Sequence, residues 1–189
     1  MSIKPQSPLE RGALRLERSQ PSGLHISELP FRELTNVRGR ADAPLLSSAI
    51  RNTLQITLPE KPNTVAAGPT HLALWLGPDE WLLQSREPLT PSIERVLRSL
   101  LAGEHAAVID VSSGYAILRL SGQTARATLS KGCPLDLHPR VFTQGTCAQS
   151  HFFKAPIVLR PAGDDAYEFT VRRSFADYAL SMLIDAAQD

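Results

Sequence analysis

Histidine and cysteine side chains are the residues of this sequence best suited to hold a metal ion or to act as nucleophiles. The histidines are His25, His71, His105, His138 and His151. No two of them lie three or four residues apart, the spacing that places two ligands on one face of a helix. Cys133 and Cys147 form no CxxC pair. We therefore expect no metal site and a reduced chain, although the cysteine count alone allows one disulfide.

Sequence motifs for phosphate binding or nucleophilic catalysis are missing. The chain has no GxGxxG, GxxxxGK[ST] or GxSxG segment. Ser112-Ser113-Gly114 fits a polar corner between two strands better than a nucleophile turn. Gly122 precedes a short predicted helix, where a turn glycine is commoner than an anion site. Cys133 could be a reactive thiol beside a basic side chain, but a buried and inert cysteine is the favoured interpretation.

Neighbouring carboxylates are the remaining candidates for acid–base chemistry. They occur as Asp79 with Glu80 and as Asp164 with Asp165, each pair in a predicted turn. Adjacent residues in a turn or strand generally point apart, so neither pair suits general acid–base catalysis. We therefore expect no catalytic, cofactor-binding or metal-binding residue on this chain.

Two tryptophans are the strongest candidates for contact with another protein. Trp75 and Trp81 flank a tight turn in the segment LALWLGPDEWLL, and we expect at least one ring to face away from the local core. The alternative is that both rings belong to the core. Arg172 and Arg173 complete the candidate partner interface, although paired surface arginines are often only solvated charges.

The composition argues against binding to nucleic acids or membranes. The 189 residues carry 20 basic and 19 acidic side chains, for a net charge of +1. This balance supplies no electrostatic attraction to phosphates or lipid head groups. The sequence also shows no signal peptide and no apolar run that could span a bilayer. We expect a cytoplasmic protein.

Periodicity predicts an α+β fold for the first half of the chain. A strand over residues 31–38 precedes a helix that Asp42 and Pro44 open, with an apolar stripe of Leu46, Ala49, Ile50, Thr53 and Leu54. Residues 71–76 and 80–85 form a hairpin. Thr90 and Pro91 begin a second helix, and residues 106–111 form a buried strand. This strand, helix, strand, strand, helix, strand order is typical of a ferredoxin-like fold.

A similar order of elements follows in the second half. It comprises a strand over 114–121, a short helix over 123–131, extended segments over 147–154 and 156–160, and an alternating strand over 167–171. Ser174 and Asp177 form a capping box for a last helix. We expect a flexible tail over 1–22 and one globular domain over 23–189, made of related halves at 23–112 and 113–189.

Four segments, taken together, resemble a known family. They are LGPDEWLL (Leu76–Leu83), DVSSGYAILRLSG (Asp110–Gly122), KGCPLDLHPRVF (Lys131–Phe142) and VRRSFADYAL (Val171–Leu180). They resemble, in order and spacing, the gamma subunit of heterotetrameric sarcosine oxidase, over residues 24–185. The resemblance implies two ferredoxin-like βαββαβ halves, as in the folate-binding domain of the glycine-cleavage T-protein.

The family resemblance also implies a multisubunit enzyme. Such a complex demethylates sarcosine oxidatively to glycine, with FAD, FMN, NAD, tetrahydrofolate and zinc held by the alpha, beta and delta subunits. The gamma subunit packs against alpha. No ligand of these cofactors maps onto this chain, so the resemblance implies a non-catalytic subunit that supports assembly.

Two alternative functions remain open at this point. One is a free-standing folate-binding protein, for which Asp110 is the only carboxylate that we nominate to bind a pterin. The other is the same subunit in a complex that acts on a different N-methyl amine.

Overall fold

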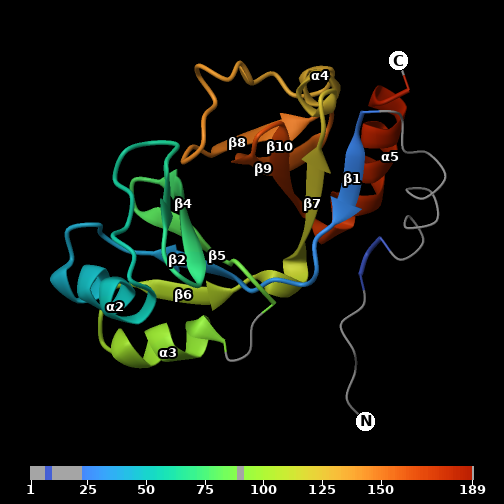
Figure 1. Cartoon of the computed structure of the whole chain (residues 1–189). Helices are drawn as coiled ribbons and strands as arrows, with labels where there is room; N and C mark the ends of the chain where they lie inside the picture. Colours follow the sequence, from blue (N-terminus) through green and yellow to red (C-terminus); the bar gives the residue numbers. More distant parts are fainter. Residues whose placement is uncertain (1–6, 10–22, 89–91, 189) are drawn as a thin grey trace, which may run out of the picture. The chain divides into compact units, whose positions relative to one another are not determined.

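The computed structural model describes residues 7–9, 23–88 and 92–188 and divides the chain into two compact units (Figure 1). Unit 1 comes from Met1–Phe31 and Ser113–Asp189, and unit 2 is the continuous segment Arg32–Ser112. The division after Ser112 falls where the sequence places the boundary between halves. That residues 23–189 act as a single domain stays a prediction.

Unit 2 has a ferredoxin-like topology with one extra edge strand. Its elements are β2 (Leu34–Arg38), α2 (Pro44–Leu54), β3 (Val65–Ala67), β4 (His71–Gly77), β5 (Glu80–Ser85), α3 (Ile93–Leu100) and β6 (Ala107–Asp110). The strands form an antiparallel sheet in the order β3-β4-β5-β2-β6. In this order β5 separates β2 from β4, and β2 separates β5 from β6, which is the split βαβ arrangement expected from the sequence.

Unit 1 builds a second five-stranded antiparallel sheet. Its elements are β1 (His25–Glu28), β7 (Tyr115–Ser121), α4 (Ala125–Ser130), β8 (Ala148–Phe152), β9 (Ala155–Gly163), β10 (Ala166–Arg172) and α5 (Ala176–Ala186). The strand order is β1-β7-β10-β9-β8. The strands predicted over 114–121 and 167–171 are therefore confirmed as β7 and β10.

The two sheets have the same arrangement of strands, but the edge strand β1 comes from the start of the chain, whereas its counterpart β6 comes from the end of its unit. β7, β10, β9 and β8 correspond in turn to β2, β5, β4 and β3, so β1 occupies in unit 1 the edge that β6 occupies in unit 2. Assigning residues 23–31 to the first half was therefore wrong. Pairing decides the assignment, because Ile26 lies opposite Leu120 and is 2% exposed in the core of unit 1.

The core of unit 2 lies between its sheet and its two helices. Val37, Trp81 and Leu83 project from the sheet onto buried side chains of α2 and α3. The predicted stripe of α2 is buried except for Thr53, which is partly exposed. The predicted Asp42 cap is wrong, because Ala43 is the N-cap and Asp42 instead pairs with Arg40 at 2.7 Å. Residues 90 and 91 lie outside the described residues.

The core of unit 1 packs α4 and α5 against one face of its sheet. The Phe152 and Phe169 rings meet edge to face at 5.5 Å, and Leu180 and Leu183 of α5 are buried in the same cluster. The predicted capping box at Ser174 is wrong, because α5 begins at Ala176 after a short 3-10 turn and no side chain caps it.

Part of the expected N-terminal tail packs against unit 1. Leu9 is 1% exposed in the core of that unit, and the Ser7 hydroxyl donates a hydrogen bond to the Glu28 carboxylate on β1. The expectation of a flexible tail is therefore wrong for residues 7–9. Residues 1–6 and 10–22 lie outside the described part of the chain.

Gly122 permits the close approach of the segment that leads into β1. Its φ is +115°, and a Cβ placed on it would lie 2.3 Å from the Gly23 carbonyl oxygen. The Gly122 amide also donates to the Asp165 carbonyl at 2.9 Å. The interpretation of Gly122 as a turn glycine therefore fits the structure. The close backbone contact with Gly23 explains why a glycine is needed at this position.

We expect Gly122→Ala to destabilise the protein by about 2–4 kcal/mol, because the new methyl group meets backbone and the residue keeps a positive φ. Gly145→Ala is the matched control. Gly145 also has a positive φ, but no atom of the residues that the structure describes lies within 4 Å of the position that its Cβ would take, so Gly145→Ala should cost only about 1–2 kcal/mol. Chemical denaturation measures both. Equal losses would show that the contact with Gly23 is unimportant.

Candidate functional site

A buried carboxylate, Glu33, caps the start of helix α3 from a distant part of the chain. Its Oε1 accepts hydrogen bonds from the Ile93 amide at 2.6 Å and from the Ser92 hydroxyl at 3.1 Å. The first turn of a helix has unpaired N–H groups and a partial positive charge, and a carboxylate satisfies both. No side chain of the N-cap residue itself makes this bond. Glu33 therefore replaces the local cap.

The second oxygen of Glu33 faces a histidine. Oε2 lies 3.7 Å from Nε2 of His71, and the two side chains are only 7% and 4% exposed. Burial by itself raises the pKa of Glu33, but His71, the Ile93 and Glu94 amides and the Ser92 hydroxyl together outweigh it and hold the pKa below its usual value. The carboxylate is therefore the stable form in the folded chain.

The Glu33–His71 pair was not among the candidates from the sequence. The alternation of side chains along a strand could have indicated it. Glu33 shares a face with Thr35 and Val37, and His71 shares a face with Ala73, so both side chains are expected on the core face of the sheet. Such a pair has the chemistry of a general acid and base. Its near-complete burial leaves no surface for a substrate, so we interpret the pair as structural.

The two tryptophans lie opposite each other on β4 and β5, and both face the helices of unit 2. Trp81 is 0% exposed, and its Nε1 donates to the Pro59 carbonyl at 2.8 Å. Its proposed role as a surface anchor for a partner is therefore wrong. Trp75 is half-buried and packs against the same core. Alternation explains the outcome, because the register pairs Trp75 with Trp81 and so puts both rings on one face.

Arg172 and Arg173 are exposed in unit 1. Arg172 ends β10 opposite Tyr115, and Arg173 begins the 3-10 turn that leads into α5. Trp75, in unit 2, and these two arginines stay predicted contact residues.

The side chains of Ser112 and Asp110 form hydrogen bonds to the backbone and to each other. The Ser112 hydroxyl accepts from the Leu34 amide at 2.9 Å and donates to the Asp110 carboxylate, which also accepts from the Ser112 amide at 2.9 Å. This arrangement fits the corner between strands. Asp110 is exposed, whereas the pterin site that we considered needs a buried carboxylate. The nomination of Asp110 for folate is therefore not supported by its position.

The remaining polar candidates form no metal centre within residues 7–9, 23–88 and 92–188. No group of three or more His, Cys, Asp or Glu side chains gathers there in a way that could hold an ion. Cys133 and Cys147 are both buried and are not joined by a disulfide. None of the described helices is long and apolar enough to cross a bilayer.

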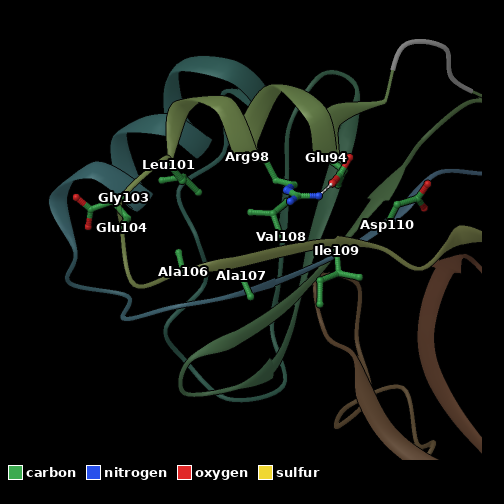
Figure 2. A pocket seen from close by; sticks show the side chains of 10 residues that line it. All are labelled: Glu94, Arg98, Leu101, Gly103, Glu104, Ala106, Ala107, Val108, Ile109 and Asp110. Carbon is green, nitrogen blue, oxygen red and sulfur yellow. Dashed lines mark hydrogen bonds and ion pairs between the residues drawn. The ribbon is translucent and has the colours of Figure 1, made fainter.

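A cavity of about 640 Å³ lies between α3 and the edge strand β6 (Figure 2). Arg98 forms an ion pair with Glu94 at 3.0 Å along the helix, and Leu101 and Val108 supply apolar walls. Glu104 and Asp110 lie towards opposite ends of the cavity (Figure 2). It holds no nucleophile with an adjacent base, so its chemistry is that of a binding surface.

A protein-family comparison identifies the relatives of this chain. A model described as the sarcosine oxidase, gamma subunit family matches residues 38–189. The sarcosine oxidase subunit gamma of Corynebacterium sp. (strain U-96) is 30% identical over 187 residues, covering 97% of this chain and 90% of that protein. The subunit gamma of Arthrobacter sp. is 32% identical over 186 residues, covering 96% and 89%.

Solved structures support the same relationship. A chain of the heterotetrameric sarcosine oxidase from Corynebacterium sp. U-96, in complex with pyrrole 2-carboxylate, superposes with a TM-score of 0.89 at 29% identity, covering 97% of this chain and 94% of that one. The glycine cleavage system aminomethyltransferase T from Bartonella henselae superposes with a TM-score of 0.65 over 90% of this chain and 48% of its own. At 14% identity it shares only the fold, which confirms the expected fold class.

We expect Glu33→Gln to lower the free energy of unfolding at neutral pH by about 1.5–3 kcal/mol, because charged hydrogen bonds to α3 are lost. A carboxyl with a lowered folded pKa contributes stability above its unfolded pKa and loses that contribution as pH falls through the folded pKa. The difference from the parent chain should therefore shrink in acid. Urea titrations across pH measure this, with the exposed Glu60→Gln as control. A difference that is independent of pH would contradict the argument.

We expect Trp81→Ala to lower the free energy of unfolding by about 3–5 kcal/mol, since it empties a buried site and leaves the Pro59 carbonyl without its donor. Trp75→Ala should cost less, because that ring is half-buried. Thermal and chemical denaturation of the isolated chain give both values. A folded Trp81→Ala chain of unchanged stability that fails only to assemble would restore the surface role.

Proposed function

The chain belongs to the sarcosine oxidase gamma subunit family, and we propose that it serves as the gamma subunit of a heterotetrameric oxidoreductase acting on sarcosine. The observation that carries this proposal is the match to a chain of the solved heterotetramer over nearly the full length of both. Partner subunits, including alpha, follow from such an assembly.

We infer that this subunit contributes to assembly and not to the chemical step. In support, the buried Glu33–His71 pair is enclosed, with Glu33 bonded to the start of α3. The Ser112 hydroxyl likewise bonds to backbone. Oxidation of an amine requires a group that accepts electrons, and none of the side chains described above supplies one. We propose that this chemistry takes place on the partner subunits.

We propose that FAD, FMN, NAD, tetrahydrofolate and zinc are held by the other subunits. In support, no group of residues that could hold zinc gathers within the described part of the chain, and Asp110, the carboxylate considered for folate, is exposed. No step through a cofactor is therefore assigned to this chain. The cytoplasmic location expected from the sequence stays a prediction, as do the partner contacts of Trp75, Arg172 and Arg173.

A free-standing folate-binding role is less well supported. The likeness to aminomethyltransferase T concerns the fold alone, and the carboxylate nominated for the pterin lies at the surface. Melting the isolated chain with increasing tetrahydrofolate would reveal such a role, since a ligand that binds only the folded state raises the melting temperature.

Co-expression with the alpha, beta and delta subunits tests the proposal. We expect this chain to co-elute with them in equal molar ratio, and expression without it to lower the yield of assembled enzyme. The isolated chain should be colourless and should produce no hydrogen peroxide from sarcosine. Assembly and turnover that proceed equally well without this chain would overturn the proposal.

A further inference from the structure

Strand β6 presents unpaired backbone groups along one edge of the unit 2 sheet. Among the described residues it pairs with β2 alone, and the Val111 amide, just beyond its end, donates to the Leu34 carbonyl at 2.9 Å. In an antiparallel ladder, hydrogen-bonding residues alternate along the strand. Ala107 and Ile109 therefore bond to β2, while the N–H and C=O groups of Val108 and Asp110 point outward.

This edge has some of the features that keep edge strands from pairing and lacks others. Natural sheets protect their edges with short strands, charged side chains, proline or a bulge, and β6 is only 4 residues long and ends on Asp110. The strand reads AVID, pairs with β2 without a register shift, and contains neither lysine nor proline. The cavity between β6 and α3 runs beside this strand (Figure 2).

The side chains beside the edge define what such a strand would carry. Glu94 is neutralised by Arg98, which leaves Glu104 and Asp110 as cavity carboxylates with no basic partner among the described residues. On the face of β6 opposite to Val108, Ile109 is 52% exposed (Figure 2). An added strand would therefore meet acidic groups on one face and an apolar side chain on the other.

We propose that β6 accepts an extended segment of a partner subunit, which adds a sixth strand to the unit 2 sheet. This inference rests on the proposed function, since it requires a partner. The segment carries basic side chains towards Glu104 and Asp110 and an apolar side chain towards Ile109. Backbone hydrogen bonds to Val108 and Asp110 supply the pairing, and the alternating side chains supply the specificity.

Charge favours a partner subunit over a second copy of this chain. A two-fold pairing of β6 with β6 would bring the same surface of each copy together. It would set Glu104 and Asp110 of one copy near the same carboxylates of the other, and like charges facing across strands destabilise pairing.

Hydrogen–deuterium exchange of the full chain, alone and in the co-expressed complex, tests the inference. We expect the Val108 and Asp110 amides to exchange at least about tenfold more slowly in the complex, because they become hydrogen-bonded. An assembled complex in which these amides exchange at the rate of the isolated chain overturns the docking site and leaves the proposed function intact. Failure to assemble at all removes both.

Two variants test the side chains. Glu104→Lys should weaken assembly by about tenfold at low salt and less at high salt, because exposed charges are screened. Ile109→Thr should weaken it by about fivefold at both salt concentrations through lost apolar burial. Glu60→Lys and Val96→Thr, at exposed positions of the same unit outside the cavity, are the matched controls.

Titration of the tagged variants into the other subunits measures these losses, and thermal melts confirm that each variant folds. Equal effects of variants and controls overturn the inference. The inference is also overturned if the β6 amides of the isolated chain exchange more slowly as the protein concentration rises. That result would indicate pairing between two copies of the chain.

Discussion

The pairing of β1 with β7 is the constraint on which unit 1 depends. Four residues near the start of the chain complete a sheet whose other strands all follow residue 113. Without β1, the buried side chains of Leu24 and Ile26 would leave the core, and the long β7 would expose one edge. Gly122 makes the pairing sterically possible, because only a residue without a side chain fits against the Gly23 carbonyl.

In unit 2 the buried carboxylate of Glu33 stabilises the start of a helix. Its second helix starts without a side-chain cap of its own, and Glu33, just before β2, supplies the acceptor. The carboxylate ties the start of α3 to the beginning of β2 and contacts His71 on β4. One side chain thus links three elements of the unit. An isolated buried charge is costly, but one with several donors is not.

The local periodicity of apolar residues predicted most helices and strands. The features that it did not predict depend on contacts between residues far apart in the sequence. The hairpin of β4 and β5, the apolar stripe of α2 and the alternation in β10 follow from periodicity within a few residues, and each is present. The origin of β1, the true cap of α3 and the burial of Trp81 depend on residues far away in the sequence. The expectation of a buried strand over 106–111 was wrong, because β6 lies at the edge of the sheet and only its Val108 is buried. The order of strands in the folded sheet decides this, and the cavity beside β6 could not be predicted for the same reason.

The discontinuity of unit 1 has a consequence for synthesis on the ribosome. Unit 2 is one uninterrupted segment, so a nascent chain can fold it as soon as Ser112 has left the exit tunnel. By contrast β1 emerges first and has no partner until Ser121 has been translated, because His25 pairs with that residue. Leu24 and Ile26 therefore have no unit 1 core to enter until that part of the chain is available, and the pairing of β1 with β7 has to close a chain loop that contains all of unit 2.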